Sequence, residues 1–323
     1  MTQVTILYTA PYMTLTVARF RSFFDKYKLT LIVPEVNERL EEAELMKYAG
    51  QFDGTICGDD RYTPRVLQAC VPRLKVIAKW GTGIDSIDRQ EAARLGIQVR
   101  NTPNAFTLPV ADTVMGYLLA FARCQPWMDR AMKAGRWEKI PGLSLSECTL
   151  GVVGVGNCGK AILRRGRAFG MKLLGNDIIP IALDFILENG VEMTTLGDLL
   201  ARSDFVSLNC DLNPTSYHLI NERTLPLMQP TAVLVNAARG PVVDEPALVK
   251  ALQTGVIAGA ALDVFEHEPL PGNSPLLKMD NVLLAPHNAN SSPAAWERVH
   301  KSTLRNLMEG LGLSYDADDL VKL

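Results

Sequence analysis

Three apolar segments in the second half of the sequence are each followed by a side chain that suits proton transfer or anion binding. These side chains are Arg239, Glu268 and His287. An arginine is permanently charged and can bond two oxygens at once, so it suits a substrate carboxylate and carbonyl. A histidine titrates near neutral pH, and a neighbouring carboxylate favours its protonated form. The three residues predict a site in which Arg239 holds a 2-oxo acid and His287, supported by Glu268, protonates the alkoxide formed by hydride transfer.

Each of these side chains also has an ordinary structural interpretation. Arg239 could be a surface cation, and Glu268 could belong to a solvated acidic turn. The other histidines are interpreted structurally, with solvent-facing positions expected for His267 and His300 and a packing or turn position for His218. The histidine after the last apolar segment follows a proline, which suits a fixed functional side chain better.

A glycine-rich segment at residues 150–159, Leu-Gly-Val-Val-Gly-Val-Gly-Asn-Cys-Gly, contains the spacing Gly-x-Gly-x-x-Gly directly after an apolar run. In this pattern Gly154 permits a tight turn, Gly156 lets the backbone approach a pyrophosphate, and Gly159 lets a helix pack close to a strand. The helix that follows would direct N–H groups and the positive end of its dipole at the phosphates. Alone the pattern is weak, because tight-turn glycines are common in parallel α/β proteins.

An acidic residue at the end of the next apolar segment favours a dinucleotide site. Asp177 lies 18 residues beyond Gly159, where a carboxylate can accept hydrogen bonds from the ribose hydroxyls of the adenosine. A phosphate on that ribose would be repelled, and residues 178–180 (Ile-Ile-Pro) offer no cation to offset the repulsion. The sequence therefore predicts NAD in preference to NADP, although a turn or N-cap role is open to any aspartate at a strand end.

The elements that would position these residues are short apolar runs alternating with amphipathic segments. This alternation predicts parallel sheets covered by helices, and 323 residues favour two domains. The first series of predicted strands is Val4–Tyr8, Leu29–Val33, Gly54–Gly58, Lys75–Trp80 and Gly96–Arg100. The second series is Leu150–Gly154, Met171–Gly175, Phe205–Asn209, Ala232–Asn236, Ile257–Leu262 and Val282–Ala285. Six strands in the second series match a complete dinucleotide-binding fold.

Two helices are expected to connect the predicted domains. Val110–Arg123 would join the two series, and Pro293–Gly310 would return to the first domain, which makes that domain discontinuous. The helices predicted within the first domain are Thr14–Tyr27, Glu38–Tyr48 and Ser86–Leu95. The predicted fold is α/β with two doubly wound parallel-sheet domains, one of residues 1–101 and 290–323 and one of residues 102–289.

Composition and charge argue against several classes of protein. With 47% hydrophobic and 21% charged residues and a net charge of -2, the chain is expected to be globular and to lack a basic face for nucleic acid. The six cysteines form no Cys-x-x-Cys pair, so neither a metal site nor a disulfide framework is predicted. No signal peptide or apolar run of about 18 residues is recognised, so a cytoplasmic location without membrane association is predicted.

Together these segments resemble the D-isomer-specific 2-hydroxyacid dehydrogenase family over nearly the whole chain. The resemblance also rests on residues 80–88 (Trp-Gly-Thr-Gly-Ile-Asp-Ser-Ile-Asp), 101–104 (Asn-Thr-Pro-Asn) and 110–112 (Val-Ala-Asp). Several motifs in a fixed order make it specific. It implies a Rossmann NAD-binding domain, a smaller flavodoxin-like substrate-binding domain made from both chain ends, and a homodimer whose surface includes Pro126–Trp137.

The resemblance also assigns roles to individual residues. It makes Arg239 a substrate-binding residue, His287 the acid/base and Glu268 its partner. The cofactor contacts that it implies are the backbone of Asn157 and Cys158 at the pyrophosphate, Asp177 at the ribose, and Ala237 and Asp263 at the nicotinamide carboxamide. The substrate contacts that it implies are the backbone of Thr82 and Gly83 at the carboxylate and Phe106 at the pocket wall.

The chain departs from the family at three positions. Thr82 stands where phosphite dehydrogenases carry a lysine, which disfavours phosphite oxidation. Asp211 replaces the proline that is usual after the fourth cofactor-domain strand, and Asn288 follows the catalytic-type histidine where an apolar residue is common. Neither of the last two changes removes a required group, but both could reshape the nicotinamide side of the site.

Two cations of the first domain bear on the identity of the substrate. Lys79 and Arg100 lie near predicted strand ends, and either could meet a phosphate or a second carboxylate, although each could also be an ordinary surface cation. Because relatives often have an arginine at the position of Lys79, the prediction favours D-3-phosphoglycerate, with glyoxylate or hydroxypyruvate as the alternative.

A function of another class is also compatible with the resemblance. The C-terminal-binding-protein corepressors of the same superfamily are NAD-sensing scaffolds that use the substrate domain to grip peptides. Retention of Arg239, Glu268 and His287 favours the enzyme over such a scaffold.

Overall fold

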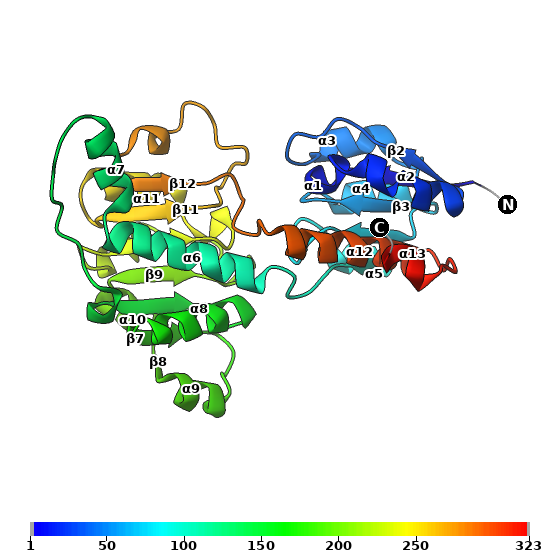
Figure 1. Ribbon diagram of the computed structural model, residues 1–323. Coiled ribbons are helices and arrows are strands. Elements are labelled where there is room, and N and C mark those ends of the chain that lie inside the picture. Colours follow the sequence, from blue (N-terminus) through cyan, green and yellow to red (C-terminus); the bar gives the residue numbers. More distant parts are fainter. Residues whose placement is uncertain (1–2, 322–323) are drawn as a thin grey trace. The chain divides into compact units, whose positions relative to one another are not determined.

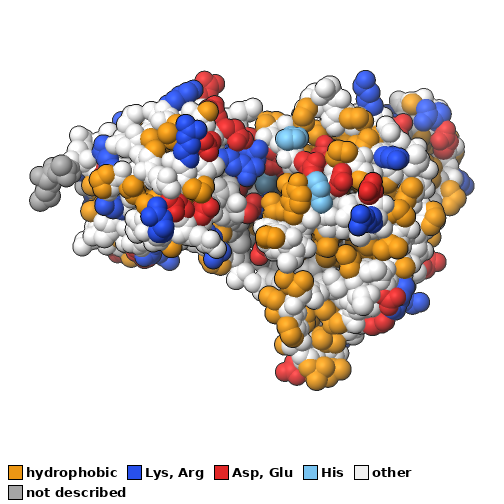
Figure 2. Space-filling view, turned by 180° about the vertical axis from the view of Figure 1, so that it is seen from behind, with side chains coloured by type: hydrophobic (Ala, Val, Ile, Leu, Met, Phe, Trp, Pro, Cys, Tyr) orange, Lys and Arg blue, Asp and Glu red, His pale blue; other side chains and the backbone are white. Residues whose placement is uncertain are grey.

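The chain folds into two compact units in the computed structural model, which describes residues 3–321 (Figure 1). The first unit is built from both chain ends, up to Phe106 and from Ser292 onward, and the second is Thr107–Ser291. The boundaries predicted from the sequence were 101/102 and 289/290. No helix among the described residues is both long and apolar enough to cross a membrane. On the face of each unit drawn in Figure 2, Lys and Arg side chains are interspersed with Asp and Glu side chains.

The first unit contains a five-stranded parallel sheet with the strand order β2-β1-β3-β4-β5. Its strands are β1 (Val4–Tyr8), β2 (Leu29–Ile32), β3 (Gly54–Cys57), β4 (Val76–Lys79) and β5 (Gln98–Arg100). Its helices are α1 (Pro11–Thr14), α2 (Val17–Lys26), α3 (Glu42–Leu45), η1 (Met46–Tyr48), α4 (Pro64–Cys70), α5 (Arg89–Arg94), α12 (Pro293–Gly310) and α13 (Ala317–Val321). The order of the strands confirms the doubly wound parallel arrangement expected for this unit.

The second unit contains a seven-stranded parallel sheet with the order β12-β11-β10-β9-β6-β7-β8. Its strands are β6 (Thr149–Val153), β7 (Lys172–Asn176), β8 (Val191–Met193), β9 (Phe205–Leu208), β10 (Val233–Asn236), β11 (Gly259–Leu262) and β12 (Val282–Leu284). Its α-helices are α6 (Thr107–Ala122), α7 (Gln125–Lys133), α8 (Asn157–Ala168), α9 (Leu183–Asn189), α10 (Leu196–Arg202) and α11 (Glu245–Gln253). Short 3-10 helices are η2 (Leu145–Glu147), η3 (Leu225–Leu227), η4 (Gly240–Val242) and η5 (Pro275–Lys278).

Successive residues of the central strands in the second unit enter two different hydrophobic cores. Val233 and Val235 of β10 pack with buried residues of α6 and α8, whereas Leu234 between them packs with buried residues of α10 and α11. Both faces of the sheet are therefore covered, which explains why its strands are continuous apolar runs. All of these parallel strands end at the same edge of the sheet, and the loops there carry the residues singled out from the sequence.

Several elements differ from the sequence-based expectation. The predicted helix Thr14–Tyr27 is α2, which begins at Val17, and the predicted helix Ser86–Leu95 is α5, which begins at Arg89. The edge strand β8 was not predicted, because it has only three residues and one of them, Glu192, is exposed. The predicted helix Glu38–Tyr48 is shorter in the structure, since α3 begins at Glu42 after a capping box formed by Glu41 and Glu44.

The expectation that His300 faces solvent was wrong. Helix α12 has the predicted bounds, but His300 is only 4% exposed and its Nδ1 accepts a hydrogen bond of 2.9 Å from Nε1 of Trp80. Burial lowers the pKa of His300 to about 4. The helix packs tightly on its sheet, as a Cβ added at Gly310 would lie 2.3 Å from a methyl carbon of Val76. His300 is therefore a neutral core residue of the first unit.

Candidate active site

The turn after β10 presents Arg239 through a small hydrogen-bonded ring. Asn236 is buried, and its side chain accepts a bond of 3.1 Å from the backbone N–H of Ala238 and donates one of 2.9 Å to the carbonyl of Arg239. The next residue, Gly240, lies so close to the loop after β11 that an added Cβ would be 1.8 Å from the carbonyl oxygen of Phe265. The turn carrying Arg239 is therefore packed directly against the loop that carries Glu268.

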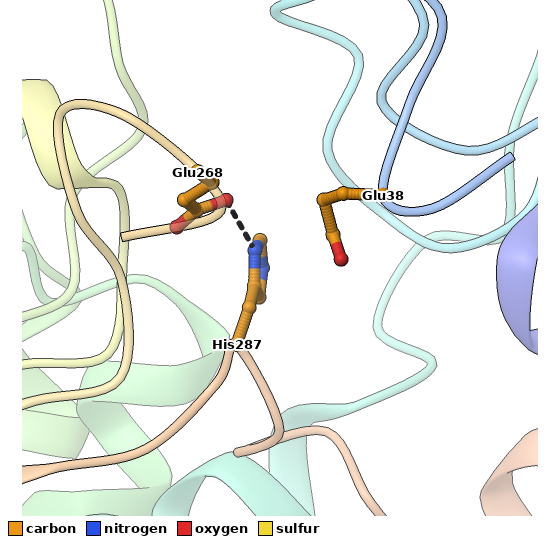
Figure 3. A group of neighbouring side chains, drawn as sticks. All are labelled: Glu38, Glu268 and His287. Carbon is orange, nitrogen blue, oxygen red and sulfur yellow. Dashed lines mark hydrogen bonds and ion pairs between the residues drawn. The ribbon is translucent and has the colours of Figure 1, made fainter. Parts of the chain in front are cut away.

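The predicted acid/base pair is hydrogen bonded. Nδ1 of His287 lies 2.9 Å from Oε2 of Glu268, and the two side chains point toward one another in Figure 3. The other oxygen of Glu268 accepts a bond of 3.0 Å from the backbone N–H of Phe265, which fixes the carboxylate. The side chains of His287 and Glu268 are 19% and 12% exposed. Glu38, the third residue drawn, belongs to the first unit.

Asp263 organises the backbone on both sides of the histidine. Its carbonyl accepts a bond of 2.7 Å from the N–H of His287, and its carboxylate oxygens accept bonds of 2.9 Å from the N–H groups of Asn288 and Ala289. The side chain is buried, and burial raises the pKa of Asp263. These bonds hold His287 at a φ of 49°, in the left-handed region that residues other than glycine uncommonly adopt. The nicotinamide contact expected for Asp263 stays a prediction.

The glycine-rich turn after β6 has the close contacts that its spacing predicts. Gly154 has a φ of 89°, and a Cβ there would lie 2.6 Å from the backbone nitrogen of Cys210. A Cβ at Gly159 would lie 2.1 Å from the carbonyl oxygen of Gly154, so only glycine lets α8 approach the turn. At Gly156, by contrast, an added Cβ would meet nothing within 4 Å, which leaves room for a group to lie on the backbone.

The start of α8 fits the pyrophosphate of a dinucleotide. Its first residues are Asn157 and Cys158, and no side chain caps its N-terminus, so the end of the helix dipole is available to an anion. Asp177, just beyond β7, accepts a bond of 2.6 Å from the backbone N–H of Val155 and one of 2.9 Å from that of Ile179. These contacts hold the carboxylate beside the glycine turn, where the ribose of a bound dinucleotide is expected.

The two cations considered for substrate binding are both paired with acids of the first unit. Lys79, at the end of β4, is 4% exposed, and its Nζ lies 3.2 Å from a carboxylate oxygen of Asp59 and 3.0 Å from the carbonyl of Trp80. Arg100, at the end of β5, bonds a carboxylate oxygen of Glu309 on α12 at 2.6 Å. Sequence reasoning missed both acids, since neither is close in sequence to the cation that it pairs with.

The loop expected to receive the substrate carboxylate is held by side-chain hydrogen bonds to the segment that follows β5. The carbonyl of Thr82 accepts a bond of 2.5 Å from the side-chain amide of Asn101, and the hydroxyl of Thr82 donates one of 3.0 Å to the carbonyl of Thr102. Thr82 is exposed and the neighbouring Gly83 is partly exposed. Phe106 packs against Trp80, with ring centroids 5.4 Å apart. Carboxylate binding at Thr82 and Gly83 is compatible with this geometry and stays a prediction, as does the pocket-wall role of Phe106.

Comparison with known proteins identifies the family. Residues 115–289 match the family model described as D-isomer specific 2-hydroxyacid dehydrogenase, NAD binding domain. The chain belongs to this family. A relative from Thermofilum pendens, a glyoxylate reductase, is 43% identical over 273 residues that cover 82% of this chain and 80% of that protein. A D-3-phosphoglycerate dehydrogenase from Methanocaldococcus jannaschii is 38% identical over 265 residues, which cover 81% of this chain and 50% of that protein.

A solved structure agrees with this assignment. D-lactate dehydrogenase from Aquifex aeolicus, complexed with NAD and lactic acid, superposes with a TM-score of 0.85 at 26% identity and covers 98% of this chain and 97% of that one. This dehydrogenase is an NAD-dependent oxidoreductase that acts on 2-hydroxy or 2-oxo acids. The predictions of family, fold class, enzyme class and cofactor are confirmed.

Proposed function

We propose that this dehydrogenase reduces a small unphosphorylated 2-oxo acid, glyoxylate or hydroxypyruvate, with NADH. The sequence-based preference for D-3-phosphoglycerate rested on the position of Lys79, with Arg100 as a second candidate for binding a phosphate. The observation that carries the proposal is that both cations already have an acidic partner, Asp59 for the first and Glu309 for the second. A phosphate would have to displace these partners, whereas glyoxylate has only one carboxylate and needs neither cation. The similarity to glyoxylate reductases supports the same choice.

The proposed chemistry assigns one task to each of three side chains. Arg239 binds the substrate carboxylate and polarises the carbonyl. Because Nδ1 of His287 is bonded to Glu268, Nε2 is the nitrogen assigned to transfer a proton to the carbonyl oxygen. The carboxylate of Glu268 favours the imidazolium that must carry this proton. NADH, when bound at the glycine turn and Asp177, would supply the hydride to the carbonyl carbon, while His287 gives its proton to the carbonyl oxygen.

A substrate panel tests the proposal. Purified protein and NADH would be mixed with glyoxylate, hydroxypyruvate or the phosphorylated 2-oxo acid that corresponds to 3-phosphoglycerate, and NADH absorbance followed. We expect kcat/KM for one of the unphosphorylated acids to exceed that for the phosphorylated acid by about ten-fold or more. A ten-fold ratio means that the enzyme stabilises the transition state of the phosphorylated acid by about 1.4 kcal/mol less. The opposite order would support the second candidate, D-3-phosphoglycerate oxidation, which the similarity to the Methanocaldococcus enzyme favours.

The scaffold function is separated from the enzyme by a single variant. Arg239→Ala should remove turnover of every 2-oxo acid in the panel, because the substrate would lose its carboxylate partner. A scaffold would instead show NAD-dependent binding to a partner protein that survives Arg239→Ala, together with no turnover by the unmodified chain.

The oligomeric state is a separate part of the proposal. We propose a homodimer that uses the segment 126–137 of the second unit, where Trp137 is 80% and Met132 is 50% exposed. Large exposed apolar side chains of this kind favour an interface. Sedimentation velocity should give a dimer, and Trp137→Ser together with Met132→Ser should shift it toward the monomer. The cytoplasmic location expected from the sequence stays a prediction.

A further inference from the structure

One segment of the second unit, residues 209–224 between β9 and the strand that follows it in sequence, is bonded to the turn that carries Arg239. The backbone N–H of His218 donates a bond of 2.8 Å to the carbonyl of Pro241, and the N–H of Ile220 donates one of 3.1 Å to the carbonyl of Val242. The N–H of Asp244 donates in turn to the carbonyl of Ile220 at 2.8 Å. The segment therefore lies beside residues 241–244, which follow Arg239, and is joined to them by backbone hydrogen bonds.

The side chain of His218 reaches a second functional loop. Its Nε2 is hydrogen bonded to Oε1 of Glu266, and the two side chains are 30% and 19% exposed. The imidazole stacks on the ring of Tyr217, with centroids 4.0 Å apart and planes 15° apart. The carbonyl of His218 accepts a bond of 2.7 Å from the side chain of Asn221, which fixes the backbone that carries the ring. The imidazole is thus held in one orientation toward Glu266.

Glu266 belongs to the same short loop as Glu268. The backbone N–H of Glu266 donates to a carboxylate oxygen of Glu245 at 3.2 Å. Glu266 is therefore held at its backbone by Glu245 and at its side chain by His218. Two residues further on, Glu268 is bonded to His287 and to the N–H of Phe265. A shift of the loop at Glu266 would therefore change the position of the carboxylate that orients His287.

We infer that His218 is a positioning residue for the hydride-transfer reaction. Its side chain holds Glu266 and through it the loop of Glu268, and its backbone N–H holds the turn of Arg239. One residue thus links the two loops whose side chains bind the substrate and orient the acid. This inference rests on the proposed roles of Glu268 and His287. A misplacement of about 1 Å in such a site can reduce the rate about 100-fold, so a loop contact of this kind can control kcat.

The test is a pair of variants measured by kinetics. His218→Ala should lower kcat for glyoxylate reduction about ten-fold, while the Kd of NADH, measured by fluorescence, stays unchanged because the glycine turn is not touched. His218→Gln should restore most of kcat, since its amide N–H can replace the Nε2 donor toward Glu266. His267→Ala is the matched control. It removes an exposed histidine from the loop of Glu266 and Glu268 and should leave kcat unchanged.

Combining His218→Ala with Glu268→Gln shows whether His218 acts through Glu268. We expect His218→Ala to cost far less in the Glu268→Gln background than alone, because the carboxylate that it positions is already neutralised. Equal losses in both backgrounds, or a fall in thermal stability with unchanged kcat, would overturn the inference. If His218→Ala does not fold, Glu266→Ala breaks the same bond from the other side and is read in the same way. A Glu268→Gln variant with full activity would instead contradict the proposed acid/base pair itself.

Discussion

The two units treat the charged residues at the ends of their parallel strands in different ways. In the second unit, Glu268 and His287 come from loops after different strands and bond each other, and the backbone N–H of Phe265 holds the carboxylate in place. In the first unit, Lys79 and Arg100 end neighbouring strands, yet each bonds a separate acid. A charged residue at a strand end therefore says little about function until its partner is known.

The histidines sharpen this comparison. His287 is partly exposed, and its ring is hydrogen bonded to the carboxylate of Glu268. His300 is buried in the first unit and accepts a hydrogen bond from Trp80, an arrangement that requires a neutral ring, and burial lowers its pKa to about 4. The same side chain is thus proposed to transfer a proton in one unit and packs in the core of the other, and its immediate neighbours account for the difference.

Removal of the catalytic-type histidine should have the largest effect. His287→Ala takes away the proposed proton donor, so kcat for glyoxylate reduction should fall by about 100- to 10,000-fold. Binding of NADH should be retained, because the glycine turn and Asp177 follow β6 and β7, whereas His287 follows β12 at one edge of the same sheet. Stopped-flow or steady-state absorbance of NADH measures the first quantity and fluorescence titration the second. Activity within a few-fold of the unmodified enzyme would mean that the proton comes from elsewhere.

Most of the fold could be predicted from the sequence because its strands are buried on both faces. A run such as Leu234-Val235 with its apolar neighbours is recognisable without knowledge of the tertiary structure, since both cores require it. β8 could not be predicted in this way, because it lies at the edge of the sheet and Glu192 interrupts its apolar character. Edge strands have one open side and therefore weaker sequence constraints.

The candidate site was predictable where a motif fixes the backbone and not where distant side chains meet. The positive φ of Gly154 follows from local spacing. The bond between His218 and Glu266 joins residues 48 positions apart, and that between Arg100 and Glu309 joins residues 209 positions apart. No periodicity links such pairs, so their existence depends on how the loops and helices pack. The acidic partners of Lys79 and Arg100, on which the proposed substrate preference rests, could not be predicted for the same reason.

The buried histidine gives the second-largest expected effect, on stability. Because the pKa of folded His300 lies below its unfolded value of 6.5, the unfolded chain takes up the proton first as the pH falls. The stability that unprotonated His300 contributes to the folded state is fully present above pH 6.5 and is lost toward pH 4. Between pH 7 and pH 5 the free energy of unfolding should therefore fall by about 2 kcal/mol. His300→Asn keeps an acceptor for Trp80 but cannot titrate. Urea unfolding at the two pH values should therefore show a smaller loss for the variant, and equal losses would contradict a neutral core histidine.

The third prediction concerns the cofactor side of the second unit. Asp177→Asn keeps an oxygen that can accept from Val155 but removes the charge, so the glycine turn should persist while repulsion of a 2′-phosphate disappears. We expect the preference for NADH over NADPH, as a ratio of kcat/KM, to fall about ten-fold, equivalent to about 1.4 kcal/mol. Asp177→Ala removes both functions and should also raise the KM for NADH. An unchanged ratio in Asp177→Asn would assign discrimination to another residue.

The smallest effect is expected for the exposed cation of the first unit. Arg100 and Glu309 are 34% and 43% exposed, and exposed ion pairs of this kind contribute about 0 to 1 kcal/mol. Arg100→Ala should therefore lower the free energy of unfolding by less than about 1 kcal/mol. It should leave kcat/KM for glyoxylate within about two-fold of the value for the unmodified enzyme. Glu309→Gln is the matched control, because it breaks the same pair and keeps the guanidinium.

If Arg100→Ala instead lowers turnover of the phosphorylated 2-oxo acid selectively, while Glu309→Gln raises it, then Arg100 exchanges its acidic partner for a substrate phosphate. In that case the contrast between the two units would concern only the protein without substrate, and the phosphorylated acid would become the preferred assignment.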